Sequence, residues 1–388
     1  MVDLFGQIFS VFFFNMRGIV QRLSLSLSVM LCVALVIATL LSLDALNRGL
    51  THALKKSGSS NVALIMRGGS QSEMNSALSG EQVNILRTAS DGSMISPEVN
   101  LIVDGIQKSD GKRANLGLRG LSDQGIGLRS GVNLVNGRWP SVGAAELVVG
   151  TDVSRRYTGF EFGETVRLGA ADWKIVGVFD ASGGVAASEI WADLTSAQTL
   201  FDRTNSFQSV RVELASSVSI AQLVEFVERD PRLNLSVQTE LEYYSTQAAK
   251  NSELIQNLAW PLAGLMGIGA LIGALNIILA SLAERRVEIA TFRAVGFRRS
   301  AICFGIIIEY VLVCLAGGLL GAIVSYLALN GAEATALAGG VTRIGYYLQF
   351  SPNGLLQAIL FAATLGALGS MVPAISASLR PVTSDLTR

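Results

Sequence analysis

The amino-acid sequence predicts an α-helical membrane protein with four transmembrane helices and a large mixed α/β domain inserted between helices 1 and 2. Half of the 388 residues are hydrophobic and only 15% are charged, which is too apolar for an ordinary soluble protein of this length. Four apolar runs each exceed the ~20 residues that cross the hydrocarbon core of a bilayer. A long polar stretch, residues 47–253, separates the first run from the second and predicts the inserted domain.

The four spans are expected at residues 23–46, 254–283, 301–329 and 354–378. The first contains the uncharged run Leu23–Leu43. We expect it to be a retained anchor, because it is long for a signal peptide and no small-residue cleavage site follows it. Residues 1–22 precede this span and include the apolar stretch Leu4–Phe14, for which an interfacial helix and an extension of the span both remain open.

Basic residues indicate which side of the membrane each loop faces. One side of a four-span topology holds these arginines: Arg17, Arg22, Arg285, Arg286, Arg293, Arg298, Arg299, Arg380 and Arg388. The short opposite loop, residues 330–353, holds only Arg343. The positive-inside rule therefore predicts that both termini, the loop 284–300 and the tail 379–388 are cytoplasmic. Residues 47–253 are then expected in the periplasm, with the protein in a bacterial inner membrane, and the opposite orientation contradicts the arginine asymmetry.

The polar domain contains alternating patterns typical of strands and periodic patterns typical of short helices. Strands are expected at Asn61–Met66, Asn100–Val103, Glu146–Val149, Thr165–Leu168, Trp173–Phe179 and Val210–Leu214. Helices are expected at Leu194–Phe201 and Ile220–Glu228, each after an Asp or Ser that suits an N-cap. A further helix over Glu240–Asn257 is expected to continue into the second span as a stalk. The three cysteines all lie in apolar runs, so this domain has no expected disulfide.

The charged loop between the second and third spans, residues 284–300, is the most informative segment. Its charged residues pair on two faces of an expected short helix, Arg286 with Arg293 and Glu284 with Glu288. Apolar residues, including Ile289 and Phe292, lie between these charges. Gly296 is expected to end the helix. A short amphipathic helix on a membrane loop predicts a docking element for a soluble partner, and the alternative is a solvated turn.

The same loop resembles the coupling helix of four-helix ABC permeases of the MacB/FtsX type. The family pattern reads Ser-x-x-Glu-Arg-x-x-Glu-Ile-Gly-x-x-Arg-Ala-x-Gly. It is matched here by Ser281, Glu284, Arg285, Glu288, Ile289, Arg293, Ala294 and Gly296, with Ala290 in place of the frequent glycine. The resemblance implies that a cytoplasmic ABC ATPase subunit docks on this loop. The implied coupling residues are Glu284, Arg285, Arg286, Glu288, Ile289, Phe292, Arg293, Ala294 and Gly296.

The polar domain also resembles the periplasmic core of this family. The matching segments follow the family order: Asn136–Pro140, Glu146–Gly150, Gly163–Val166, Trp173–Val178, Ser188–Trp191 and Ala197–Gln198. The weakest match is residues 67–95, which we interpret as a variable loop or a small helical insert. No catalytic constellation is evident, and a single histidine, His52, gives no basis for a multi-histidine metal site. Asp91, Asp104, Asp110 and Asp123 lie near glycines, which turn chemistry explains better than metal binding.

Two features of the third span leave alternatives open. A carboxylate inside a span, Glu309, fits either proton coupling or a structural contact, and a structural contact is favoured because ATP supplies the energy in this family. Gly317, Gly318 and Gly321 predict close helix packing. The family resemblance implies a dimer interface for these glycines, and packing within the chain is the alternative.

No Gly-x-x-x-x-Gly-Lys-Ser/Thr motif occurs in the sequence, so we expect a non-catalytic permease subunit that needs a separate ATPase and no cofactor. The family resemblance implies a second permease copy, as a homo- or heterodimer, and export driven by mechanotransmission. A periplasmic adaptor and an outer-membrane channel are further implied partners. The zero net charge gives no indication of nucleic-acid binding. The alternatives are a non-transporting regulator of a cell-wall hydrolase and a lipoprotein-release permease.

Overall fold

The computed structural model describes residues 4–19, 23–89, 93–129, 131–214, 219–338 and 342–379. These residues form two compact units. The helical unit lies within 1–48, 253–332 and 348–388, and the sheet unit lies within 49–252 and 333–347. Arg22, Asp91, Arg380 and Arg388, which entered the sequence argument, lie outside the described residues.

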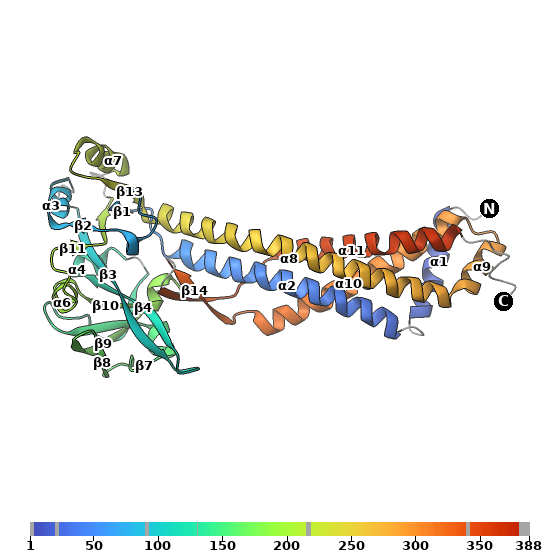
Figure 1. Cartoon of the computed structure of the whole chain (residues 1–388), viewed down its shortest axis with the longest axis horizontal. Helices are drawn as coiled ribbons and strands as arrows, with labels where there is room; N and C mark the ends of the chain where they lie inside the picture. Colours follow the sequence, from blue (N-terminus) through green and yellow to red (C-terminus); the bar gives the residue numbers. More distant parts are fainter. Residues whose placement is uncertain are drawn as a thin grey trace. The chain divides into compact units, whose positions relative to one another are not determined.

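The helices of the helical unit confirm the predicted fold class. Four helices are long and apolar enough to cross a membrane, namely α2 (Leu23–Lys56), α8 (Glu240–Glu284), α10 (Arg299–Leu329) and α11 (Pro352–Leu379) (Figure 1). Two shorter helices, α1 (Leu4–Ile19) and α9 (Arg286–Ala294), complete the unit. α8 is one continuous helix of 45 residues, so the expected stalk and the second span are one element.

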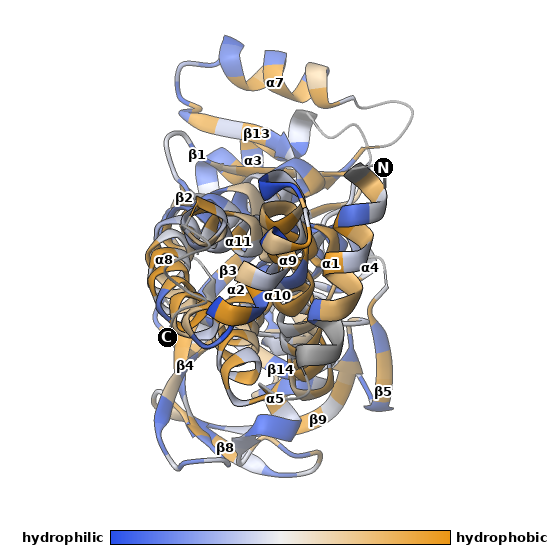
Figure 2. Ribbon diagram, turned by 90° about the vertical axis from the view of Figure 1, so that its right-hand side faces the viewer, coloured by the Kyte–Doolittle hydropathy of each residue, from blue (hydrophilic) through white to orange (hydrophobic). Residues whose placement is uncertain are grey.

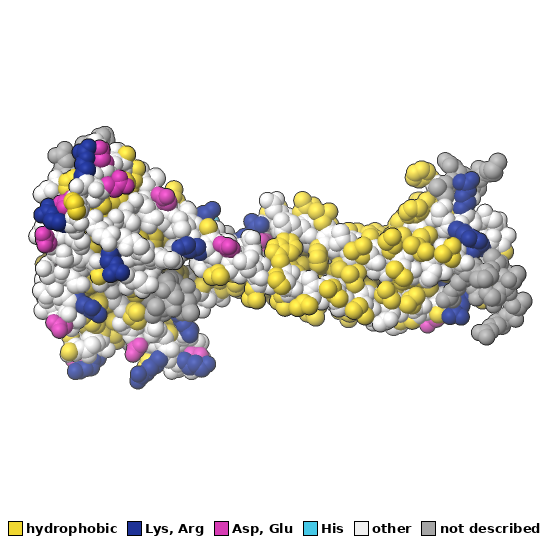
Figure 3. Space-filling model, turned by 45° about the horizontal axis from the view of Figure 1, so that its top comes forward, with side chains coloured by type: hydrophobic (Ala, Val, Ile, Leu, Met, Phe, Trp, Pro, Cys, Tyr) yellow, Lys and Arg dark blue, Asp and Glu magenta, His cyan; other side chains and the backbone are white. Residues whose placement is uncertain are grey.

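The outer surface of the helical unit is apolar, as a membrane-spanning bundle requires. Hydrophobic side chains run along these helices, and Lys and Arg side chains gather near α9 (Figure 3). α1 carries both hydrophobic and hydrophilic residues (Figure 2), and its Val11 is buried against α10. A Cβ added to Gly305 of α10 would lie 2.6 Å from Val11 Cγ1, so glycine permits this close approach.

The sheet unit is built on one eleven-stranded sheet. Nine strands follow the order β13-β1-β12-β3-β4-β10-β6-β9-β5, while β7 pairs with β3 and β8 pairs with β9. Their bounds are β1 Val62–Arg67, β3 Ile95–Gln107, β4 Arg113–Leu121, β5 Asn133–Gly137, β6 Glu146–Gly150, β7 Tyr157–Thr158, β8 Thr165–Leu168, β9 Ala171–Asp180, β10 Glu189–Asp193, β12 Ser209–Glu213 and β13 Leu235–Thr239. All six predicted strands are present, which confirms those predictions to within a few residues except at β3, which is much longer.

Short helices cover the sheet and close its hydrophobic cores. They are α3 (Gly80–Ala89), α4 (Asp123–Gly127), α5 (Thr151–Arg156), α6 (Leu194–Leu200) and α7 (Ile220–Arg229), with 3-10 turns η2 (Glu73–Asn75) and η3 (Val185–Ser188). The predicted N-caps are confirmed. The Asp193 side chain accepts a hydrogen bond from Ser196 N–H at α6, and Ser219 forms a capping box with Gln222 at α7.

The loop between α10 and α11 forms a hairpin that the sequence argument missed. β14 (Glu333–Ala338) pairs antiparallel with β15 (Thr342–Tyr347), and the hairpin belongs to the sheet unit. Gly345 N–H donates to Ser188 Oγ at 2.9 Å. Glu333 forms ion pairs with Arg155 at 2.7 Å and with Arg156 at 2.9 Å. The chain therefore contributes to the sheet unit from two separate parts of the sequence.

The stretch 67–95, expected as a variable loop or small helical insert, does contain a helix, α3, and a short strand, β2 (Leu78–Ser79), paired with β11 (Ser206–Phe207). It also carries a buried charge. Glu73 in η2 is only 5% exposed, so part of this stretch is structural core rather than a variable surface loop.

Candidate functional site

The helix α9 is positioned by a break at its start and a glycine at its end. Arg285, with φ −98° and ψ 12°, is the single residue between α8 and α9. At the other end Gly296 has φ +103°, a conformation that only glycine adopts without strain. Gly296 N–H donates to Arg293 O at 3.2 Å and Phe297 N–H donates to Phe292 O at 3.1 Å, which is the Schellman pattern. The prediction that Gly296 ends this helix is confirmed.

One face of α9 packs inward. Ala290 is buried, and Ile289 and Phe292 are partly buried against the core of the helical unit. The Phe292 ring makes edge contacts with Phe14 of α1 at 5.1 Å and with Phe297 at 5.4 Å between centroids. Ile289 and Phe292 were grouped with the expected coupling residues. The structure turns both inward, so their contribution is to hold α9 against the bundle.

The other face of α9 is open to solvent. Val287 is 59% exposed and Val295 is 73% exposed, and Arg286, Thr291 and Ala294 are exposed beside them. Val287, Thr291, Ala294 and Val295 recur at helical spacing and therefore share one face. We call Arg286, Val287, Thr291, Ala294 and Val295 the α9 outer face. An apolar stripe flanked by a cation is suited to contact with a protein partner.

The expected pairing of Glu284 with Glu288 on one helix face is wrong. Glu284 is the last residue of α8, whereas Glu288 lies in the first turn of α9. The break at Arg285 separates them, so the i, i+4 spacing of one continuous helix does not apply to this pair. Glu284 is exposed, while Glu288 is half-buried and receives a hydrogen bond from Arg285 Nε at 3.3 Å.

Arg285 is buried and holds three helices together. Its Nη1 lies 2.8 Å from Glu309 Oε2 of α10, and its Nη2 donates to the Asn15 side-chain oxygen of α1. The guanidinium group is 3% exposed, so it is not available for docking. Glu309 has a structural partner in this ion pair, and the favoured structural interpretation accounts for its place in the span.

Arg293 is directed toward the end of another span. Its Nη1 donates to the carbonyl oxygen of Ser378, in the last turn of α11, at 2.9 Å. A cation at the carboxyl end of a helix satisfies an orphan carbonyl and favours the helix dipole. Arg286 and Arg293 thus differ in role, since Arg286 faces solvent.

The glycines of the third span pack within the chain. A Cβ on Gly317 would lie 2.6 Å from Met30 O of α2, and one on Gly318 would lie 2.9 Å from Ala362 Cβ of α11. A Cβ on Gly321 would likewise be too close to the backbone carbonyl oxygen of Ala34. Packing within the chain therefore explains all three glycines. In contrast, Gly264, Gly269 and Gly273 of α8 have no neighbour within 4 Å among the described residues.

A buried cluster of charges in the sheet unit was missed entirely. Its members are Glu73, Glu98, Arg119, Arg129, Glu189, Arg211 and Glu240. We call it the ionic ladder. Arg211 is 1% exposed and Glu98 is 0% exposed. Of these residues only Arg211 lies inside an expected strand, Val210–Leu214, and alternation alone assigns such a charged side chain to solvent.

The arginines keep the carboxylates of the ladder ionised. Burial alone would raise the pKa of Glu98, but the guanidinium groups of Arg129, Arg211 and Arg119 outweigh it and lower that pKa to about 2. Burial likewise opposes ionisation of Glu73, and the charges of Arg119 and Arg211 bring its pKa well below the usual range. Burial raises and Arg119 lowers the pKa of Glu189, with a net decrease. Glu73, Glu98 and Glu189 are therefore ionised at neutral pH.

Comparison with known families decides the identity of the chain. The MacB-like periplasmic core domain family matches residues 25–229, and the FtsX-like permease C-terminal family matches residues 262–381. The chain belongs to the MacB/FtsX-type permease family. It is accordingly a multi-pass membrane protein of the ABC transporter permease type.

Individual proteins named MacB are similar to this chain in sequence. The "Macrolide export ATP-binding/permease protein MacB" of Hahella chejuensis is 27% identical over 224 residues, covering 56% of this chain and 33% of the relative. The Escherichia coli protein of the same name is 44% identical over 115 residues, which are 29% of this chain and 17% of that protein. The chain spans about a third of the length of the first such relatives.

Two solved structures are similar to part of the chain. The periplasmic region of MacB from Actinobacillus actinomycetemcomitans has a TM-score of 0.38 and 14% identity, and covers 54% of this chain and 98% of that one. The extracellular domain of the transporter YknZ has a TM-score of 0.35 and 16% identity, and covers 46% of this chain and all of that one (100%).

Proposed function

We propose that this MacB/FtsX-type permease couples ATP hydrolysis by a cytoplasmic ABC ATPase to a conformational change of its periplasmic sheet unit, which drives export or extrusion of a substrate. The observation that carries the proposal is the geometry of α9. Its inner face is packed against the bundle, while the α9 outer face presents Arg286, Val287 and Ala294 to solvent. A partner that pushes on this face moves a short helix that is firmly held by its neighbours.

The connections of α9 supply routes for that motion. Arg285 alone separates α9 from α8, a continuous helix of 45 residues. The ion pair of Arg285 with Glu309 adds a connection to α10. We infer that displacement of α9 shifts α8 and α10 together, which is the mechanotransmission expected for this family. Because the family's relatives are named for macrolide export, an exported substrate, a periplasmic adaptor and an outer-membrane channel are proposed for this chain as well.

The membrane orientation is part of the proposal. The helical unit carries Arg286, Arg293, Arg298 and Arg299 beside α9, whereas Arg343 is in the hairpin of the sheet unit. By the positive-inside rule α9 is cytoplasmic and the sheet unit is periplasmic. The α9 outer face is then on the side where ATP is available.

A second permease copy is proposed to pack on α8. Gly269 and Gly273, four residues apart on one face of α8, have open space above them among the described residues, and Leu265, Ile268 and Ile272 are exposed nearby. Small residues on an open helix face allow two backbones to approach closely in a membrane. The proposed interface is therefore on α8 rather than on the glycines of α10, in a homo- or heterodimer.

The decisive experiment tests the α9 outer face. The full chain is purified from its host membranes, and the ATPase that co-purifies is identified and its hydrolysis rate measured. Ala294→Trp should remove at least about 90% of the bound ATPase, since a desolvated contact loses several kcal/mol to a clash or an unpaired charge. Arg286→Glu should also reduce the amount of bound ATPase.

Ala170→Trp, an exposed alanine in the turn between β8 and β9, is the matched control and should retain wild-type binding. Full ATPase binding and hydrolysis in both α9 variants would mean that this loop is a solvated turn, and the proposed function would lose its main support.

A further inference from the structure

The ionic ladder crosses four neighbouring strands of the sheet with alternating charge. Arg211 of β12, Glu98 of β3, Arg119 of β4 and Glu189 of β10 follow the strand order of the sheet. Arg119 lies 2.8 Å from Glu98 and 2.7 Å from Glu189, and Arg211 pairs with Glu98 directly. The ladder therefore links strands that belong to two of the hydrophobic cores of the unit, the one that includes residues of α7 and the one that includes residues of α6.

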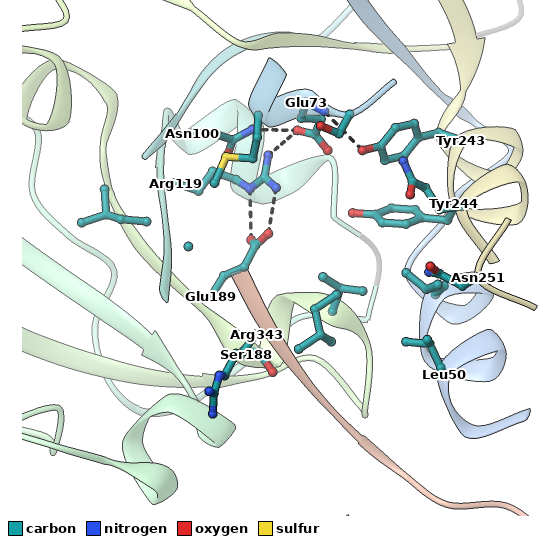
Figure 4. A pocket seen from close by; sticks show the side chains of 18 of the residues that line it. Leu50, Glu73, Asn100, Arg119, Ser188, Glu189, Tyr243, Tyr244, Asn251 and Arg343 are labelled. Carbon is teal, nitrogen blue, oxygen red and sulfur yellow. Dashed lines mark hydrogen bonds and ion pairs between the residues drawn. The ribbon is translucent and has the colours of Figure 1, made fainter. Parts of the chain in front are cut away.

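Glu73 closes the ladder from the side. Its carboxylate lies 2.7 Å from Arg119 and 3.0 Å from Arg211, and it also accepts hydrogen bonds from the Asn100 amide and the Ser209 hydroxyl. Figure 4 shows Glu73 and Glu189 on opposite sides of the Arg119 guanidinium group. Glu73, Glu98, Arg119 and Arg211 each pair with at least two members of the cluster, so a displacement of any one of these four side chains is opposed by the others.

The first turns of α8 attach to this ladder. Glu240, the first residue of α8, lies 3.0 Å from Arg211 Nε through Oε1 and accepts a hydrogen bond from Ser59 N–H at 3.2 Å through Oε2. The Tyr243 hydroxyl accepts from Glu73 N–H at 3.3 Å, and Gln247 Nε2 donates to Gln71 O at 2.8 Å. Positions 240, 243 and 247 lie on one helix face, so a single face of α8 is fastened to the sheet unit.

We propose that Glu240 is the positioning residue that makes the sheet unit follow the motion of α8. This inference rests on the proposed function, because it assigns the point where motion of the stalk enters the periplasmic unit. Glu240 is 5% exposed and Arg211 is 1% exposed, so their ion pair is shielded from water and acts at a low local dielectric. It is the one ion pair between α8 and the ladder among the described residues.

A small cavity beside this attachment supports a mechanical role. Its volume is about 90 Å³, and its lining includes Glu73, Arg119, Glu189, Tyr243 and Tyr244. The Tyr244 hydroxyl points into it (Figure 4). Small-molecule sites usually measure ~300–1,000 Å³, so this space is too small for a typical ligand. It separates the α8 face from Glu189. Near the cavity α8 is held by Glu240, Tyr243 and Gln247, and farther along by the contacts of Lys250 with Gln71 and of Ser252 with Thr51.

The test removes the Glu240 link while leaving the ladder intact. Arg211 keeps Glu73 and Glu98 as partners in a Glu240→Ala variant. Spin labels replace Ala249 on α8 and Lys174 on β9, both exposed, in a full-length chain whose native cysteines are replaced. Distances between the labels are measured with the co-purified ATPase, without nucleotide and with ATP plus vanadate.

In the wild type we expect one narrow distance distribution that is the same in both states, because the sheet unit follows α8. Glu240→Ala should broaden the distribution at least about twofold upon trapping with ATP, while the rate of ATP hydrolysis stays within about twofold of wild type. Glu242→Ala, an exposed carboxylate in the same turn, is the matched control and should behave as wild type. An unchanged distribution in Glu240→Ala would overturn the proposal.

A second variant keeps the test decisive if the first does not fold. If Glu240→Ala unfolds the sheet unit, the measurement is made on Glu240→Gln, which keeps the side-chain volume and the acceptor for Ser59 N–H but loses the charge. Broadening supports the proposal, and a wild-type distribution refutes it. Failure of the proposed function itself is distinguishable, since ATPase would then be absent from the purified wild-type complex.

Discussion

Nη1 of Arg285 lies 2.8 Å from Oε2 of Glu309, and both side chains are buried, with 3% and 7% of their surfaces exposed. Arg285 is also the single residue between α8 and α9. The ion pair therefore fixes the turn before α9 to the third span. A charge in a membrane span is explained here by a partner in the same chain rather than by proton transfer.

Breaking this ion pair should destabilise the chain strongly. Glu309→Ala leaves the buried Arg285 guanidinium without its main partner, which typically costs ~3–5 kcal/mol of unfolding free energy. The double variant Arg285→Met with Glu309→Leu should recover most of this loss, because well-packed apolar residues often replace a buried pair at little cost. The measurement is SDS-induced unfolding of the purified chain.

Glu284→Ala, at the exposed end of α8, serves as the control and should change the unfolding free energy by less than about 0.5 kcal/mol. Equal stability of Glu309→Ala and wild type would show that the pair does not hold the helices together.

Glycines of α10 and α8 should respond differently to the same substitution. Gly317→Leu places a side chain against the backbone of Met30, where a Cβ alone would already lie 2.6 Å from the carbonyl oxygen. We expect a loss of at least about 1–3 kcal/mol in unfolding free energy, or failure to fold. Gly269→Leu, in open space, should leave the single chain stable and reduce dimerisation in membranes at least about fivefold. Identical effects of the two substitutions would contradict the assignment of Gly317 to packing within the chain and of Gly269 to contact with a second copy.

The ionic ladder predicts how the sheet unit responds to acid. The pKa of Glu98 is about 2 in the folded unit against 4.5 as its ordinary value. A lowered pKa contributes stability that is present above about pH 4.5 and is lost as the pH falls toward 2. Stability should therefore decrease through this window. Fluorescence of Trp191 is a suitable probe, because the Arg129 guanidinium lies 5.1 Å from its ring.

Glu98→Gln removes this titration and should flatten the decrease. A residual slope remains, because the pKa values of Glu73 and Glu189 are also lowered and those of Glu146 and Asp230 are about 2, mainly through their hydrogen bonds with Arg138 and Arg232. An equally steep decrease in wild type and Glu98→Gln would place the acid sensitivity elsewhere.

Membrane orientation can be measured on whole cells. In a chain without native cysteines, Lys174→Cys in β9 should react with a membrane-impermeant maleimide added to spheroplasts. Val287→Cys on α9 should react only after the membrane is opened. This outcome follows from the arginine asymmetry of the loops. Labelling of Val287→Cys in sealed spheroplasts would reverse the proposed topology.

Local features of the chain were predictable from the sequence. The four spans follow from the length of apolar runs, and the end of α9 follows from Gly296, since both depend only on neighbouring residues. The ionic ladder was not predictable in this way. Arg211 pairs with Glu98 and Glu73, which are 113 and 138 residues away in the chain. Alternation in β12 places Arg211 on one face of the strand and Val210 and Val212 on the other. Only the tertiary structure reveals that both faces are buried.

The hairpin β14–β15 was missed for a related reason. Residues 330–353 are short enough for a simple connection between spans, and nothing local reveals that Gly345 meets Ser188 or that Glu333 meets Arg155 and Arg156. Burial of Arg285 was missed as well, because the partner Glu309 lies in the next helix.

The hairpin has a practical consequence for anyone who wishes to isolate the sheet unit. A recombinant fragment cut as one continuous segment, 49–252, would lack β15 and would uncover the surface that Ile344 and Tyr346 now occupy, at 2% and 3% exposure. Such a fragment is expected to aggregate, or to crystallise with a neighbouring molecule packed on the uncovered surface. Grafting residues 333–347 back through a flexible linker would restore the hairpin β14–β15 and cover this surface again.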